Sequence, residues 1–250
     1  MTGVVDDLVA EQSTLDALVV QISEAEWRRP TPAPGWSVAD TVTHLAMSNE
    51  AAIASVEGRG REVFAGVMRD PDAALARQDD EARRRTGAEI RSWWRETGSQ
   101  LESCLRTAPS SLRVFWGIGE MSVLSLATAR LMECWAHGLD VFAAVGAQSV
   151  DTDRIRHVCH LGYRTLPYAF EFAGVAVPGR LEDLRLELES PDGRDCWRYG
   201  LDAAPQRITG SAGEFARLAV RRMARRDART LGAEGPVADA ALDVAKAYLL

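Results

Sequence analysis

Lysine is nearly missing from this 250-residue chain, in which Lys246 is the single example and almost every positive charge is an arginine. Acidic residues outnumber basic ones, 36 Asp and Glu against 29 Lys and Arg, giving a formal net charge of -7. Binding to nucleic-acid phosphates depends on clustered positive charge, so this balance argues against a general nucleic-acid binder. One basic run does occur, at residues 221–226.

Cysteines are few and long apolar runs are lacking. The four cysteines are widely spaced and form no Cys-x-x-Cys pair, which is typical of reduced thiols rather than a disulfide framework. No segment approaches 18 consecutive apolar residues, and Asp6 and Asp7 stand where a signal peptide needs positive charge. We therefore expect a cytoplasmic protein.

Apolar residues recur at helical spacing in four long segments of the first 150 residues. The expected helices span residues 4–22, 38–57, 71–107 and 120–145. Irregular segments rich in proline or glycine precede the second and fourth helices, and Gly87 weakens the third. Four such helices predict a bundle, whose interior commonly builds metal sites from facing helices.

The pattern changes after residue 150. A helix is expected over residues 154–172, which Pro167 should kink or shorten. Alternating apolar and charged residues then predict a strand at 184–189, with a partner strand at 196–199. Helices should begin near Gly210 and cover 237–250. The sequence thus predicts an α+β protein, with a helical domain over residues 1–150 and a small α+β domain over 151–250.

Three potential metal ligands share one face of the fourth expected helix. Glu133 and His137 are four residues apart and Asp140 follows three later, so their side chains leave the same side of the helix. His44, on the second expected helix, is a candidate third ligand. Two histidines and a carboxylate form a recognised catalytic metal set. The alternative is an ordinary amphipathic helix with Glu133 and His137 in water.

Two further features of these helices allow more than one interpretation. Asp40 is expected to close a helix cap with Ser37, but it also stands one turn before His44 and could orient that imidazole. Trp135 belongs to an apolar stripe opposite Glu133, which the C-terminal domain is expected to cover. His157 and His160 share a helical face, but no partner carboxylate is nearby, so packing or interdomain hydrogen bonding is the preferred interpretation.

Segments 34–46 (PGWSVADTVTHLA) and 133–140 (ECWAHGLD) resemble the two signature segments of the mycothiol-dependent maleylpyruvate isomerase family, a branch of the DinB-like metal-binding bundles. The resemblance implies that His44, Glu133 and His137 bind a divalent metal, usually zinc. It also implies a DinB-like four-helix bundle followed by a linker helix and a sterol-carrier-like C-terminal domain. Asp40 and Asp140 would then form hydrogen bonds that orient the metal ligands.

The same resemblance implies an arginine in the active-site cleft. In the C-terminal domain of this family, a helix that begins with glycine ends in a Gly-Arg pair, and the Arg reaches the cleft. The matching position is Arg222, but Arg221 replaces the glycine, so the choice between the two arginines stays open. Arg222 is the expected catalytic residue, and a solvated basic face is the alternative.

The activity implied is that of a zinc enzyme using mycothiol, the low-molecular-weight thiol of actinobacteria, as cosubstrate. A small electrophile such as maleylpyruvate would be isomerised or would accept the thiol in a transfer reaction. A non-catalytic small-molecule binding protein, with a structural metal or none, is the alternative. RNA-base modification is a third option, disfavoured by the net charge of -7. Nucleic-acid and membrane partners are not expected, and the oligomeric state stays open, with a homodimer as one option.

Overall fold

The computed structural model describes residues 2–248. The chain divides into two compact units, Met1–Ser149 and Val150–Leu250. The chain is an α+β protein: the first unit is mainly helical and the second combines helices with a sheet. Among the described residues, no helix is both long and apolar enough to cross a membrane.

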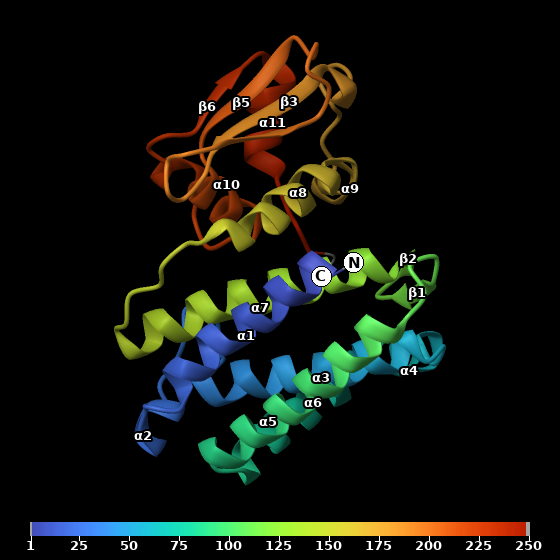
Figure 1. Ribbon diagram of the computed structural model, residues 1–250, viewed down its shortest axis with the longest axis vertical. Helices are drawn as coiled ribbons and strands as arrows, with labels where there is room; N and C mark the ends of the chain where they lie inside the picture. Colours follow the sequence, from blue (N-terminus) through green and yellow to red (C-terminus); the bar gives the residue numbers. More distant parts are fainter. Residues whose placement is uncertain (1, 249–250) are drawn as a thin grey trace. The chain divides into compact units, whose positions relative to one another are not determined.

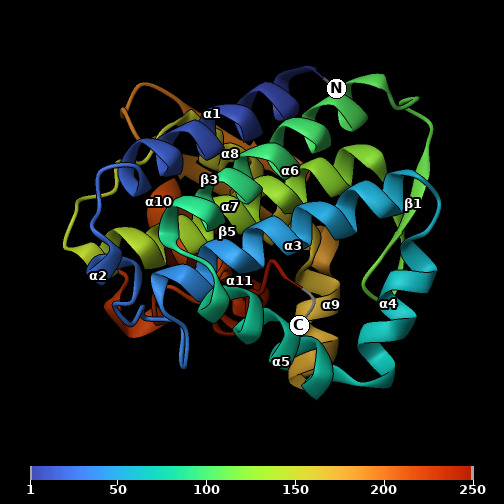
Figure 2. The same ribbon diagram turned by 90° about the horizontal axis from the view of Figure 1, so that it is seen from below.

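Four long helices run alongside one another in the first unit (Figures 1 and 2). They are α1 (Thr2–Val19), α3 (Val38–Val56), α6 (Gly87–Thr107) and α7 (Val123–Val145). Helix α3 packs against α6 and α7, and α1 packs against the same two helices. Shorter helices complete the unit: α2 (Glu24–Trp27), α4 (Gly60–Arg69) and α5 (Pro71–Arg84).

The third expected helix is in fact two helices. The single helix expected over residues 71–107 was wrong, because the chain turns between α5 and α6 at Arg85 and Thr86. Thr86 and Glu89 form a capping box that starts α6 at Gly87. A Cβ atom on Gly87 would lie 2.3 Å from the Trp27 ring, so glycine is required here by close packing. The extra turn lets α5 fold back along α3.

A β-hairpin precedes α7, where the sequence predicted only an irregular break. Strands β1 (Arg113–Trp116) and β2 (Gly119–Ser122) pair antiparallel, with Gly117 in the connecting turn at φ 62°. Ser122 then caps α7 by accepting the backbone N–H of Ser125. The helix therefore begins at Val123 rather than at the expected Glu120.

Helix α7 is buried on nearly all sides, as its buried residues include Leu131, Cys134, Trp135 and Val141. Within the first unit α1 and α3 both pack against it. Packing of Trp135 against the second unit stays a prediction.

The second unit starts with a short 3₁₀ turn (Asp153–Ile155) and two helices, α8 (Arg156–Arg164) and α9 (Leu166–Ala173). The break between them falls at Thr165, two residues before Pro167, so the helix expected over residues 154–172 is shortened rather than kinked. Its sheet has the order β4-β3-β5-β6 (Figure 1). These strands are β3 (Leu184–Glu189), β4 (Cys196–Tyr199), β5 (Gln206–Ser211) and β6 (Gly232–Glu234).

Strands β3 and β5 are parallel, and the other neighbours are antiparallel. Leu184, Leu186 and Leu188 are buried along one face of β3, as their alternation predicted. Strands β5 and β6 were not expected: residues 206–211 continue as a strand up to the start of α10 (Ala212–Ala219). The last helix, α11, is Pro236–Val244, shorter than the expected 237–250, of which residues 249–250 lie outside the described part.

Candidate metal centre

Two neighbouring helices of the bundle bring together the three expected ligands. His44 comes from α3, Glu133 and His137 come from α7, and one ligand atom of each lies within 4.8 Å of the others. Glu133 Oε2 lies 3.4 Å from His44 Nε2 and 3.3 Å from His137 Nε2. In the described part of the chain this is the one group of three or more His, Cys, Asp or Glu residues placed to hold a metal ion.

These distances match the donor spacing of a tetrahedral metal site. With bonds of about 2.0–2.1 Å, neighbouring ligand atoms of such a site lie about 3.3–3.4 Å apart. The spacing from Glu133 to each imidazole therefore needs no side-chain rearrangement. Two nitrogens and one carboxylate oxygen suit zinc or a related transition metal.

Both imidazoles present Nε2 to the centre and use Nδ1 for a second contact. His137 Nδ1 lies 3.3 Å from Asp140 Oδ2, and His44 Nδ1 lies 3.3 Å from Gln78 Oε1. Each oxygen can accept an Nδ1–H, which leaves the lone pair of Nε2 free for a metal. Asp140 therefore contacts the ring nitrogen of His137 that faces away from the centre, the position expected for it from the sequence.

Asp40 takes the helix-cap role expected for it, rather than the support of His44 that was its alternative. Its carboxylate accepts the backbone N–H of Ser37 at 2.8 Å in a capping box. Gln78 on α5 takes the supporting place instead. No sequence pattern indicated this role, because Gln78 lies in the polar run of residues 77–85, which is typical of a solvated helical face.

Trp36 forms an aromatic wall against both histidines, a role that sequence reasoning missed. Its ring stacks on His137, with centroids 5.5 Å apart at 26°, and lies 4.9 Å from the His44 ring. A backbone hydrogen bond from Thr31 N–H to Trp36 O (2.8 Å) ties the ends of the loop that carries the indole. Its place inside the first signature segment was the available signal.

The charges of the three residues are set by burial and by their mutual hydrogen bonds. Burial lowers the pKa of His44 and outweighs its hydrogen bond to Glu133. Burial alone would raise the pKa of Glu133, but hydrogen bonds from His137 and His44 hold it well below its usual value. Burial would also lower the pKa of His137, yet hydrogen bonds to Asp140 and Glu133 raise it. The centre thus holds an ionised carboxylate beside imidazoles.

The two candidate arginines of the second unit do not end a helix as expected. Helix α10 stops at Ala219, and Arg221 adopts a left-handed backbone conformation with φ 58°. Arg221 donates a hydrogen bond to the Val244 carbonyl (3.1 Å), and Arg222 donates one to the Val220 carbonyl (2.9 Å). The role of either arginine in the active-site cleft stays a prediction.

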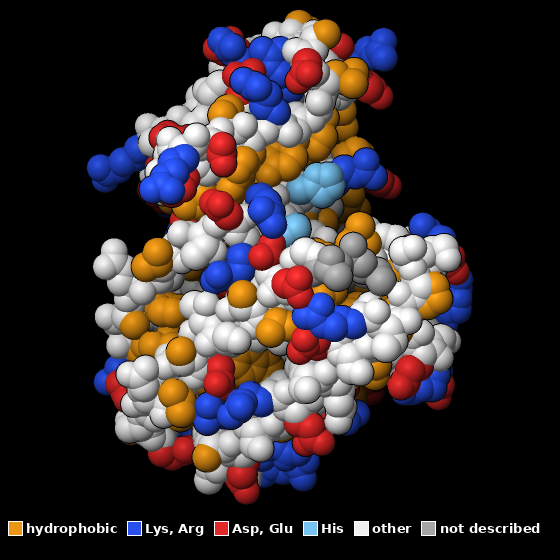
Figure 3. Space-filling view, in the orientation of Figure 1, with side chains coloured by type: hydrophobic (Ala, Val, Ile, Leu, Met, Phe, Trp, Pro, Cys, Tyr) orange, Lys and Arg blue, Asp and Glu red, His pale blue; other side chains and the backbone are white. Residues whose placement is uncertain are grey.

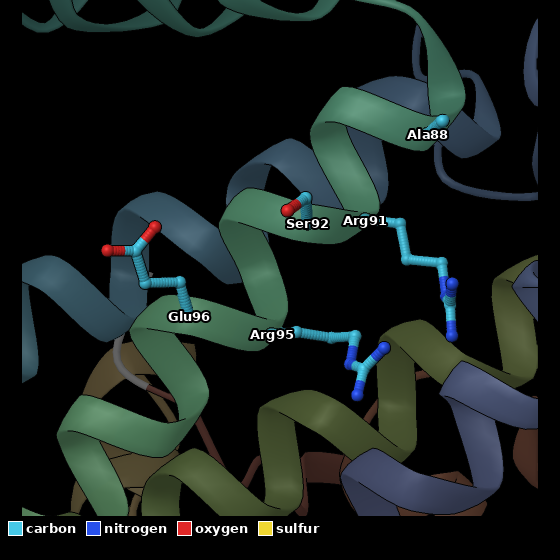
Figure 4. A pocket seen from close by; sticks show the side chains of 5 residues that line it. All are labelled: Ala88, Arg91, Ser92, Arg95 and Glu96. Carbon is cyan, nitrogen blue, oxygen red and sulfur yellow. The ribbon is translucent and has the colours of Figure 1, made fainter.

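Other surface features do not compete with this centre. A depression of about 290 Å³ lies on α6, lined by Arg91, Arg95 and three neighbours (Figure 4). Arg91 is already paired with Asp16 through two hydrogen bonds of 2.6 and 2.9 Å, so its charge is compensated. On the face shown in Figure 3, acidic and basic side chains are interspersed, which gives no basic patch for nucleic acid there.

The fold and the centre together define a two-unit α+β protein whose helical bundle gathers two histidines and a glutamate. The family model of the mycothiol maleylpyruvate isomerase N-terminal domain matches residues 8–142, which hold all three of these side chains. The chain therefore belongs to the mycothiol-dependent maleylpyruvate isomerase family.

Relatives and solved structures agree with this assignment. Two uncharacterized proteins, from two strains of Mycobacterium tuberculosis, are each 39% identical over 222 residues, covering 88% of this chain and 85% of the relative. The crystal structure of the mycothiol-dependent maleylpyruvate isomerase superposes with a TM-score of 0.61 at 17% identity, covering 93% of this chain and 92% of that one. A histidine-to-alanine mutant of that enzyme gives a TM-score of 0.60 at 16% identity. At such identities these two likenesses establish the fold.

Proposed function

We propose that this protein is a mycothiol-dependent metalloenzyme, with zinc or another divalent metal held by His44, Glu133 and His137. The observation that carries the proposal is the convergence of Glu133 Oε2 with two imidazole Nε2 atoms at 3.3 and 3.4 Å, in a chain of this family. When bound, a divalent cation supplies Lewis acidity, which lowers the pKa of a coordinating thiol and provides a nucleophile near neutral pH.

The residues around the centre would prepare it for the divalent cation. Glu133 supplies the negative charge that offsets part of the cation's charge. Asp140 and Gln78 fix the orientation of the two imidazoles, so little reorganisation is needed on binding. Trp36 covers the histidine rings on one side and restricts access there.

The substrate class follows from the family and from the thiol chemistry. A thiol nucleophile can add to an activated double bond, allow rotation about the resulting single bond and leave again, which is cis-trans isomerisation. It can also stay attached to an electrophile, which is thiol transfer. We propose a small unsaturated acid such as maleylpyruvate as the electrophile, and Arg222 as the residue that grips its carboxylate or part of the thiol.

Metal content is the first test. The purified protein should carry about one divalent metal ion per chain, and His44→Ala and His137→Ala should each lose most of it, because two remaining ligands rarely hold a metal. His160→Ala, which changes an exposed histidine of the second unit, is the matched control and should keep its metal. Circular dichroism checks folding. Full metal occupancy in both centre variants would exclude this ligand set.

Activity separates the enzyme from a binding protein. The metal-loaded protein should convert an unsaturated diacid or ketoacid only when mycothiol is present, and His137→Ala should abolish the conversion. A protein that binds metal but converts none of these substrates with mycothiol would favour the non-catalytic alternative.

A further inference from the structure

A buried arginine lies one turn from the candidate metal centre. Arg130 on α7 precedes Glu133 by three residues, so both side chains leave the same face of the helix. Arg130 is only 2% exposed and is the largest fully buried side chain among the described residues. The Glu133 side chain, by contrast, is 23% exposed, so the neighbouring turn opens to solvent.

The guanidinium has few of the partners that a buried charge needs. Its one hydrogen bond within the described chain is a long contact of 3.5 Å from Nη2 to Asn49 Oδ1, and its Nε–H has none. No carboxylate of a described residue lies within ion-pair distance of it. The Trp116 ring, 5.8 Å away, supplies a weak cation–π contact. The Nδ2 amide of Asn49, also buried, has no hydrogen-bond partner either.

Such an arrangement is costly without an anion. An isolated buried charge carries a large desolvation penalty, and a guanidinium cannot escape that penalty by losing its proton in a protein. Burial lowers the pKa of Arg130, which reflects the same penalty. A divalent cation held by Glu133 would add positive charge one turn away and increase the deficit of negative charge. The unpartnered atoms of Arg130 and Asn49 are all N–H donors, the groups that bind carboxylates.

We propose that Arg130 and Asn49 form a subsite for a carboxylate group of the substrate, inside the bundle and next to the metal centre. The inference rests on the proposed function only in assigning the carboxylate to the electrophile that reacts there. A planar carboxylate would accept from the guanidinium and from the Asn49 amide. The electrophilic carbon of the substrate would then lie toward Glu133 and the other two metal ligands.

The subsite can be tested on the metal-free protein without any thiol. After chelation and buffer exchange, maleate should bind in calorimetry and raise the melting temperature more than sodium chloride does at the same ionic strength. In Asn49→Asp the new carboxylate lies beside Arg130 and replaces the ligand. That variant should bind maleate at least about tenfold more weakly, while melting no lower than the parent protein without maleate.

Further variants and anions sharpen the result. Arg130→Met should lose maleate binding as well, whereas Arg91→Met, which changes a surface arginine paired with Asp16, should keep it. Inorganic phosphate should bind more weakly than maleate. The proposal is overturned if maleate acts no differently from chloride, if Asn49→Asp binds it as tightly as the parent, or if phosphate binds equally well. Because metal and thiol are absent, failure here leaves the proposed function standing, and loss of thiol activity would leave this binding intact.

Discussion

At the scale of single residues, the backbone of Arg221 helps to choose between the two candidate arginines. The chain after α10 closes with a hydrogen bond from Arg222 N–H to the Arg217 carbonyl at 2.8 Å, and Arg221 takes the left-handed conformation that usually belongs to glycine. The family segment has a glycine before its arginine at this point. The conformation of Arg221 is thus that of the glycine position, which supports Arg222 as the counterpart of the family's arginine.

This conformation predicts the effect of two substitutions. Arg221→Gly and Arg221→Ala both remove the guanidinium contact with Val244, but only glycine adopts φ near 58° without a steric penalty. Arg221→Gly should therefore be more stable than Arg221→Ala by about 1 kcal/mol. Urea unfolding followed by circular dichroism measures the difference. Equal midpoints would show that the left-handed conformation carries no cost here.

At the scale of elements, one carboxylate joins the start of α10 to the segment that leads into β6. Glu214 accepts the backbone N–H groups of Arg229 and Thr230 at 3.1 and 2.8 Å, and the Thr230 hydroxyl at 2.7 Å. Burial alone would raise the pKa of Glu214, but these hydrogen bonds lower it overall. The ionised form is therefore favoured in the folded protein more than in the unfolded chain.

Glu214→Gln should destabilise the protein near neutral pH by about 1–3 kcal/mol, because an amide oxygen is a weaker acceptor than a carboxylate. Since the folded pKa is depressed, the contribution of Glu214 is complete above the pKa of the unfolded chain and is lost as pH falls toward the lower folded pKa. The difference between parent and variant should therefore shrink in acid. Urea unfolding at pH 7 and near pH 3 tests this, and a difference that grows in acid would contradict it.

At the scale of the whole molecule, the question is whether the second unit takes part in the chemistry of the bundle. The two units meet in the sequence between Ser149 and Val150, and the proposed role of Arg222 requires the second unit to supply a group to the centre of the first. A guanidinium binds a carboxylate through two parallel hydrogen bonds, which a lysine cannot reproduce.

Arg222→Lys should therefore reduce thiol-dependent turnover by tenfold or more, the roughly 1.4 kcal/mol expected for one lost charge-assisted hydrogen bond. Metal content and melting temperature should stay nearly unchanged, because lysine keeps the charge and Arg222 is no metal ligand. Arg226→Lys changes an exposed arginine four residues after Arg222 and serves as control. Equal turnover in both variants would favour the alternative interpretation from the sequence, in which Arg222 belongs to a solvated basic face.

Features that depend on local periodicity and on short motifs could be predicted from the amino-acid sequence. Helical spacing identified α1, α3 and α7, and alternation identified β3. The spacing of Glu133 and His137 placed them on one face because four residues make about one helical turn. The resemblance of residues 34–46 and 133–140 to a known family predicted that His44 belongs to the same centre. In the structure His44 lies beside Glu133 and His137.

The contacts between side chains across the bundle could not be predicted from the sequence, because they depend on how the helices pack. The fold of α5 onto α3 brings Gln78 to His44, and the capping box with Ser37 engages the Asp40 carboxylate. The burial of Arg130 beside Asn49, far apart in the sequence, was equally invisible to periodicity. Contacts between distant segments depend on the packing of whole helices, and one-dimensional spacing does not encode how two helices are rotated against each other.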